Sequence, residues 1–250
     1  MTFALETRAL QKQFGGLKVT RDLSLRIAPG ARHAVIGPNG AGKTTVINLL
    51  TGVLKPNAGR ILLDGSDITD LPVHTRVLRG LSRTFQINQL YPELTPLETI
   101  GLVVSERLGR GSDWWRRMGT RDDVNAEIAE NLARFHLLDV MNEPTATLPY
   151  GKQRLLEIAV AIAARPRVLL LDEPAAGVPE GERHDILAAV SALPRDVTVL
   201  LIEHDMDLVF SFADRISVLV NGALLVEGAP DEVARDARVK AVYLGEAADA

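Results

Sequence analysis

Cysteine is absent from this chain of 250 residues, and so is any long apolar run. Without cysteine there is no disulfide framework and no cysteine-based zinc site, and a reducing compartment fits. The densest apolar stretches are 168–171, 197–202 and 216–220. Each is far shorter than the roughly 18 residues that a membrane-spanning helix needs. A membrane role would therefore have to come through a partner chain.

An excess of positive charge is also lacking. The formal net charge is -4, which disfavours general binding to the phosphate backbone of nucleic acids, so we expect no nucleic-acid partner. The first residues, Met1 to Arg8, do not combine a basic start with an apolar run, so we expect no signal peptide.

Strand-like and helix-like stretches alternate along much of the chain. Leu23, Leu25 and Ile27 alternate with polar residues, as in a half-covered strand, and 33–36 and 44–50 read as a strand and a helix. The last third alternates helix and strand at 154–164, 168–171, 182–193 and 197–202. Such alternation predicts an α/β fold with a mostly parallel sheet.

The middle third differs from its flanks. Residues 126–138 place Ile128, Leu132 and Phe135 at helical spacing, which predicts a mostly helical insert at about 87–148 within a single domain of 1–250. An irregular excursion is expected at 109–120. Near the end, Asn221-Gly222 between two apolar runs predicts a tight hairpin.

The strongest motif is a glycine-rich loop that fits G-x-x-x-x-G-K-[ST] in full: Gly37, Pro38, Asn39, Gly40, Ala41, Gly42, Lys43 and Thr44. Glycines let successive N–H groups turn toward an anion, and the helix N-terminus adds positive charge. Lys43 would reach the β and γ phosphates of ATP, Thr44 would ligate Mg²⁺, and Thr45 would contact the α phosphate. A chance glycine-rich turn is the alternative, but the position between a strand and a helix favours nucleotide binding.

Two acids, Asp172 and Glu173, end the apolar strand 168–171. Asp172 would hold Mg²⁺ through water, as a hard oxygen ligand does. Glu173 would orient and polarise the attacking water. The alternative is that both acids only solvate the end of a strand.

With these motifs the sequence resembles the ABC transporter ATPase family over essentially its whole length. Further elements follow in the family's order: Phe14, Gln86, the signature segment 148–153, the D-loop segment 175–179 and His204. The resemblance implies a P-loop NTPase (RecA-like) core with an antiparallel β subdomain and a helical subdomain.

The resemblance also implies roles for single residues. Phe14 would stack on adenine, Gln86 would sense Mg²⁺ and couple to the membrane subunit, and His204 would contact the γ phosphate. Gly151, in the signature, would contact ATP held by the opposite subunit. Phe14 as a core residue and His204 as an ordinary half-buried histidine are the alternatives.

The branch that the chain resembles is the LivG-type ATPase of branched-chain amino acid importers. Such an ATPase pairs with a second ATPase subunit, as a hetero- or homodimer, and with multi-spanning permease subunits at the cytoplasmic face of the inner or plasma membrane. It works indirectly with a solute-binding protein. Importers of urea, amides or lipid, and a non-transport ABC ATPase, remain alternatives. A small-molecule kinase would not explain Gln86, the signature and His204 in series.

The signature departs from the family's Leu-Ser-Gly-Gly-Gln. Pro149 replaces the serine, Tyr150 the first glycine and Lys152 the glutamine, while Pro179 replaces the D-loop aspartate. Pro149 cannot donate a hydrogen bond worth about 1.5–3 kcal/mol to a phosphate. We therefore expect a heterodimer with two unequal sites.

One surface candidate stands apart from these motifs, the stretch Trp114-Trp115-Arg116-Arg117. Aromatic and basic residues favour interfaces, so it is a candidate contact for the membrane subunit or for lipid headgroups. Packing within the helical insert is the alternative.

Overall fold

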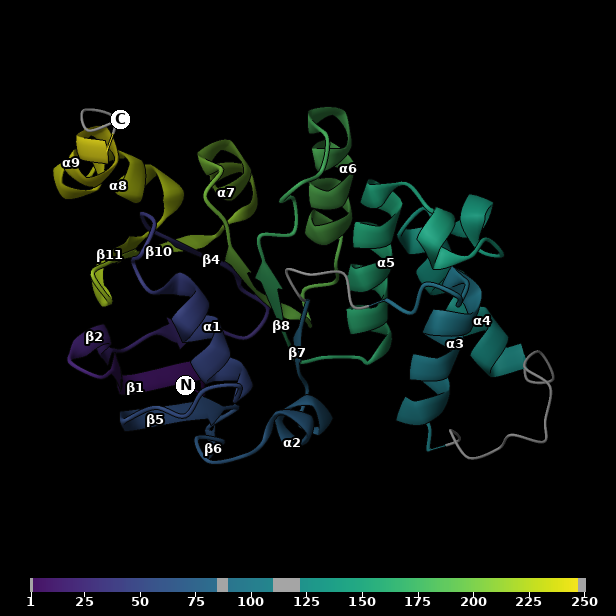
Figure 1. Ribbon diagram of the computed structural model, residues 1–250, viewed down its shortest axis with the longest axis horizontal. Coiled ribbons are helices and arrows are strands. Elements are labelled where there is room, and N and C mark those ends of the chain that lie inside the picture. The colour runs from purple at the N-terminus through teal and green to yellow at the C-terminus, as the bar shows by residue number, and fades with distance from the viewer. Residues whose placement is uncertain (1, 85–89, 110–121, 247–250) are drawn as a thin grey trace. The chain divides into compact units, whose positions relative to one another are not determined.

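The computed structural model describes residues 2–84, 90–109 and 122–246 (Figure 1). The chain forms two compact units. Unit 1 comprises Met1–Arg83, Arg167–Glu173 and Pro194–Ala250, and unit 2 comprises Thr84–Pro166 and Pro174–Leu193. The insert predicted at 87–148 falls within the range of unit 2, while 109–120 lies almost wholly outside the described residues.

Unit 1 contains an antiparallel sheet with the strand order β2-β1-β5-β6, in which β3 also pairs with β1. Its strands are β1 (Leu5–Phe14), β2 (Leu17–Leu23), β3 (Arg26–Ile27), β5 (Ala58–Leu63) and β6 (Ser66–Asp67). The prediction of one continuous strand through Leu23, Leu25 and Ile27 is wrong, because the strand breaks after Leu23. The Thr7 hydroxyl bridges the break, donating to the Leu23 carbonyl and accepting from the Leu25 N–H.

The second sheet of unit 1 confirms the mostly parallel sheet, with the order β11-β10-β4-β9-β8-β7. Only the pairing of β11 with β10 is antiparallel. Its strands are β4 (Arg32–Ile36), β7 (Leu81–Arg83), β8 (Val168–Asp172), β9 (Thr198–Ile202), β10 (Arg215–Val220) and β11 (Ala223–Gly228). Strands β4, β8 and β9 are buried along their whole length, which explains their mostly apolar sequences, although β4 begins with the buried Arg32 and His33.

Helix α1 (Lys43–Thr51) lies between the two sheets (Figure 1). Val46, Ile47, Leu49 and Leu50 share one core cluster with side chains from both sheets. Full burial of each such side chain contributes about 1.5–3 kcal/mol, so the start of α1 is fixed by the core. The other helices of unit 1 are α2 (Val73–Leu78), α7 (Met206–Phe212), α8 (Pro230–Arg235) and α9 (Ala237–Glu246).

Unit 2 is helical in its described residues. It contains α3 (Pro96–Arg107), α4 (Asp122–Arg134), α5 (Tyr150–Ala163), α6 (Glu180–Ser191) and the short 3₁₀ helices η1 (Leu138–Val140) and η2 (Thr145–Thr147). Helix α3 begins with a capping box between Thr95 and Glu98. No helix among the described residues of either unit has the length and apolar character to cross a bilayer.

Helix α4 ends at Arg134, four residues before the predicted end. His136 adopts a left-handed backbone with φ 52°. Its N–H donates to the Ala133 carbonyl, and the Leu137 N–H donates to the Leu132 carbonyl. This pair of bonds is a Schellman cap, and the buried Leu132 and Leu137 supply its usual apolar contact.

The hairpin predicted at Asn221-Gly222 is confirmed between β10 and β11. Both residues have positive φ, 49° and 78°, as a type I′ turn requires. The Gly222 N–H donates to the Ala41 carbonyl, and the Arg21 N–H donates to the Gly222 carbonyl. The turn is therefore tied to the glycine-rich loop on one side and to β2 on the other.

A buried polar chain joins β4, β10 and β11. The Ser217 hydroxyl donates to Glu227 at 2.9 Å, so its oxygen accepts from Nε2–H of His33 at 2.8 Å. This assigns the neutral tautomer with hydrogen on Nε2, and the buried Nδ1 has no hydrogen-bond partner among the described residues. Burial lowers the pKa of His33 to about 4, against the opposing charge of Glu227.

Gly222→Ala is expected to destabilise the protein by more than the about 1–2 kcal/mol cost of a left-handed backbone. The added Cβ would lie 2.1 Å from the Val19 carbonyl oxygen, which is main chain and cannot rotate away. Urea unfolding measures the change. Gly16→Ala is the control, because Gly16 has open space around it and no positive φ. Equal unfolding midpoints for the two variants would contradict the prediction.

Stability is expected to fall as the pH drops from about 6.5 to about 4, partly through His33. Its folded pKa lies below the unfolded value, so the unfolded chain binds a proton in this window that the folded chain does not. His33→Gln removes this titration and should flatten the dependence of the unfolding free energy on pH. His74→Gln, at an exposed position, should leave the slope unchanged. An unaltered slope in His33→Gln would refute the assignment.

Candidate nucleotide site

The glycine-rich loop connects the end of β4 to the start of α1 in unit 1. Gly42 caps the helix in a left-handed conformation, φ 98° and ψ 8°, and a Cβ there would lie 2.8 Å from the Val19 carbonyl oxygen. Glycine is therefore required at this position by both conformation and space. The Ala41 N–H donates to the Pro38 carbonyl and closes the turn inside the loop.

Lys43 points its ammonium group back into the loop. Its Nζ donates to the Gly37 carbonyl and, at 3.1 Å, to the Pro38 carbonyl. Thr44 and Thr45 follow in the first turn of α1, where backbone N–H groups have no acceptor within the helix. The loop thus combines oriented amides, a helix N-terminus and a cation, which together suit an anion carrying several charges.

Asp172 lies at the end of β8 with its side chain 1% exposed. Its Oδ2 accepts from Arg83 at 2.8 Å, and Arg83 also donates to Asn48 of α1. Its Oδ1 is buried and has no hydrogen-bond partner among the described residues. Burial raises the pKa of Asp172, and Arg83 opposes the rise. A buried carboxylate oxygen left over in this way fits the hard-oxygen preference of Mg²⁺.

Glu173 occupies a left-handed backbone position, φ 48°, which is uncommon for glutamate. Its N–H still donates to the Ile202 carbonyl, so the β8–β9 pairing continues to the point where the chain turns. The turn brings its Oε1 to 3.8 Å from Nδ1 of His204. The structure thus places together two of the residues singled out in the sequence, from the ends of neighbouring strands.

Sequence reasoning missed Glu203, the residue between β9 and His204. Its side chain is 2% exposed, and its Oε2 accepts from the His204 N–H at 3.1 Å. The same oxygen lies 3.7 Å from Nδ1 of His204. The available signal was that an acid directly follows the apolar stretch 197–202 with no turn residue between them. Acids are rarely buried unless they are paired, so an acid in this position indicates a specific contact.

Phe14 ends β1 with 48% of its surface exposed, so it is not a core residue. The Lys12 ammonium lies 5.1 Å from the centre of its ring, at cation–π distance. An exposed aromatic ring with a cation beside it is suited to stack on a further flat group.

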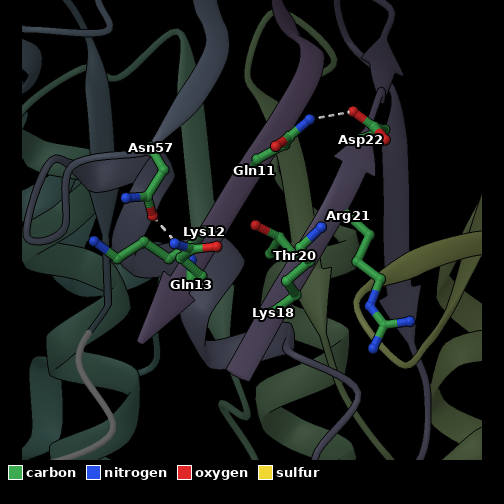
Figure 2. Close-up of a pocket in the computed structure, with 8 residues that line it drawn as sticks. All are labelled: Gln11, Lys12, Gln13, Lys18, Thr20, Arg21, Asp22 and Asn57. Carbon is green, nitrogen blue, oxygen red and sulfur yellow. Dashed lines mark hydrogen bonds between the residues drawn. The ribbon is translucent and has the colours of Figure 1, made fainter. Parts of the chain in front are cut away.

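A polar hollow of about 230 Å³ opens beside strands β1 and β2. Figure 2 shows Gln11 reaching Asp22 across it and Asn57 accepting from the Gln13 N–H. Lys12, Lys18, Thr20 and Arg21 complete the lining. None of these residues belongs to the glycine-rich loop or to the 172–173 acids, so the hollow is not assigned to the site.

The signature segment lies in unit 2 and forms the start of α5. The helix begins at Tyr150, four residues before the predicted start at Arg154, because Pro149 caps it and accepts from the Gln153 N–H. Gly151 is buried against Glu182, whose Oε2 would lie 2.1 Å from an added Cβ. An ordinary side chain at 151 would thus displace Glu182.

Lys152 does not extend freely from the signature. Its ammonium bonds Asp139 at 2.9 Å and the His136 carbonyl. The Lys152 ammonium lowers the pKa of Asp139. The positive charge of Lys152, next to Gly151 in the sequence, is therefore engaged within unit 2.

Tyr150 connects the signature to the D-loop segment 175–179. Its hydroxyl donates to the Ala176 carbonyl at 3.4 Å, and the Arg154 guanidinium lies 5.1 Å from its ring centre. Pro179 caps α6. Gln86, Trp114 and Trp115 lie outside the described residues.

Comparison with known proteins agrees with this geometry. The family model described as ABC transporter matches residues 20–176, and a model described as branched-chain amino acid ATP-binding cassette transporter matches residues 223–249. The transport ATP-binding protein BraF of Pseudomonas aeruginosa is 40% identical, and LivG of Escherichia coli is 37% identical. Both alignments cover 97% of this chain and 98% of the relative.

Solved structures agree as well. The ADP conformation of MJ1267, an ATP-binding cassette of an ABC transporter, is 31% identical, with a TM-score of 0.83 over 98% of this chain and 99% of that chain. A nucleotide-free ATP-binding cassette is 30% identical, with a TM-score of 0.82 over 97% and 99%. The α/β fold with a P-loop NTPase core is thereby confirmed, and the chain belongs to the ABC transporter family as an ATP-binding cassette.

Proposed function

We propose that this cassette hydrolyses ATP at the site built from Lys43, Asp172, Glu173 and His204, and that the hydrolysis drives an importer. The observation that carries the proposal lies within unit 1: the loop holds the Lys43 ammonium, whose charge opposes the rise that burial causes in the pKa of Asp172 at the end of β8. Phosphoryl transfer to water depends mainly on positioning and charge stabilisation, and this arrangement supplies both.

Nucleotide binding is assigned to the loop and to one aromatic ring. Amides of the loop surround the β and γ phosphates, beside the Lys43 ammonium, and Thr45 contacts the α phosphate. Phe14 stacks on adenine, which suits its exposed ring. The loop residues concerned are Gly37, Pro38, Asn39, Gly40, Ala41, Gly42, Lys43, Thr44 and Thr45.

Different residues are proposed to hold the metal ion and to orient the attacking water. Thr44, Asp172 and Gln86 would hold Mg²⁺, which when bound neutralises charge on the phosphates. Glu173 accepts a hydrogen bond from the attacking water and orients it toward the γ phosphate. His204 contacts the γ phosphate and stabilises the charge that develops there.

A second cassette completes the site in this proposal. The free amides at the start of its signature helix, including the one equivalent to Gly151, cover the γ phosphate of this chain. Pro149 has no hydroxyl to donate, and Lys152 is engaged by Asp139, so this chain offers its partner a weaker signature. If the second cassette carries the full signature, the pair is a heterodimer with two unequal sites, whereas a homodimer would have two equal sites.

The transported solute is proposed from the relatives. BraF and LivG are named as high-affinity branched-chain amino acid transport ATP-binding proteins, and the match at 223–249 is to a model of the same description. We assign the cassette to an importer of branched-chain or related amino acids, bound to permease subunits at the cytoplasmic face of the membrane. A solute-binding protein selects the cargo in this scheme.

Lys43→Ala and Glu173→Gln are expected to separate binding from hydrolysis. Lys43→Ala should lose retention of Mg·ATP, because the ammonium group is the cation of the loop. Glu173→Gln should bind Mg·ATP as wild type does but turn over about 100-fold or more slowly. Equilibrium dialysis and phosphate release measure the two effects. Lys240→Ala, an exposed lysine, is the control. Full retention by Lys43→Ala would refute the site.

Reconstitution with the membrane and solute-binding partners is expected to assign the cargo. Leucine, isoleucine or valine, offered with the binding protein, should raise ATP turnover in liposomes, and urea or short amides should not. Stimulation by urea alone would reject the proposed solute while leaving the ATPase assignment intact.

A further inference from the structure

Glu203 is a buried carboxylate next to the proposed γ-phosphate contact. It directly follows β9, and its side chain is 2% exposed. Removing a carboxylate from water is costly unless specific contacts compensate it. The contacts that Glu203 makes with His204 therefore bear on its role.

Two of its contacts are with His204. Oε2 of Glu203 accepts the His204 N–H at 3.1 Å and lies 3.7 Å from Nδ1 of the ring. Oε1 of Glu173 lies 3.8 Å from the same Nδ1. Two carboxylates thus face one edge of the imidazole. The ring distances are long for hydrogen bonds but short enough for electrostatic attraction.

The main chain around His204 is anchored on both sides. Before it, the Ile202 carbonyl accepts the Glu173 N–H. After it, Asp205 caps α7 by accepting from the N–H groups of Asp207 and Leu208. The His204 side chain itself is 65% exposed, so packing does little to orient the ring. Its orientation depends instead on the charged groups beside Nδ1.

We propose that Glu203 is a positioning residue that holds the Nδ1 edge of His204 toward the acids and leaves Nε2 facing the γ phosphate. An ionised carboxylate only accepts hydrogen bonds, so in this proposal Nδ1, which faces the acids, carries the ring hydrogen. Partners of this kind fix the orientation of a histidine that works through its other nitrogen. The inference rests on the proposed role of His204.

Glu203→Gln tests the inference in the full chain assembled with its membrane partners. Glutamine keeps an acceptor for the His204 N–H but removes the charge beside the ring. We expect kcat to fall about 10-fold, as for loss of other orienting partners. The KM for ATP should stay within about twofold, because the glycine-rich loop, Lys43 and Phe14 still bind the nucleotide. Glu6→Gln, a buried acid of the antiparallel sheet, is the control and should keep full turnover.

A double-mutant cycle distinguishes positioning from a general effect on the fold. In the His204→Ala background, Glu203→Gln should cause no further loss of turnover, since its target is gone. The same 10-fold loss in that background, or full turnover of Glu203→Gln alone, would overturn the inference. Full turnover of His204→Ala would overturn it together with the role of His204. Even in that case, loss of Mg·ATP retention by Lys43→Ala would still support the proposed ATP site.

Discussion

The structure depends on holding a row of backbone amides and one ammonium group at a fixed point between β4 and α1. Amides can bind an anion strongly only if their orientation is set beforehand, because reorganising them costs binding energy. Here the orientation is set by the apolar core on both sides of α1 and by the left-handed Gly42. The hairpin turn at Gly222 bonds the Ala41 carbonyl and supports the loop from outside.

The acids around this point differ in how deeply they are buried and in which groups they contact. Asp172 is balanced by Arg83 yet keeps one oxygen without a partner among the described residues, which suits a cation. Glu203 bonds the His204 main chain and faces its ring. Glu173 stays 26% exposed beside the same histidine, where water has access. Burial and neighbouring groups, rather than residue type, thus give each carboxylate a different environment.

The signature segment shows how departures from a family pattern are absorbed. Pro149 still caps α5 through its carbonyl, and Tyr150 and Lys152 bond groups within unit 2. The segment therefore keeps its helix, but it lacks the serine hydroxyl, and the ammonium group of Lys152 is engaged by Asp139.

The sequence by itself determined the features that depend on neighbouring residues. The glycine-rich loop, the Asn221-Gly222 turn and the apolar strands are local signals, because backbone conformation and side-chain periodicity are set within a few residues. Only the tertiary structure decided the pairs that are distant in the chain. Arg83 meets Asp172 across 89 positions, and His33 meets Ser217 across 184. It also showed that Glu203 is buried, because burial is a property of everything that packs around a residue.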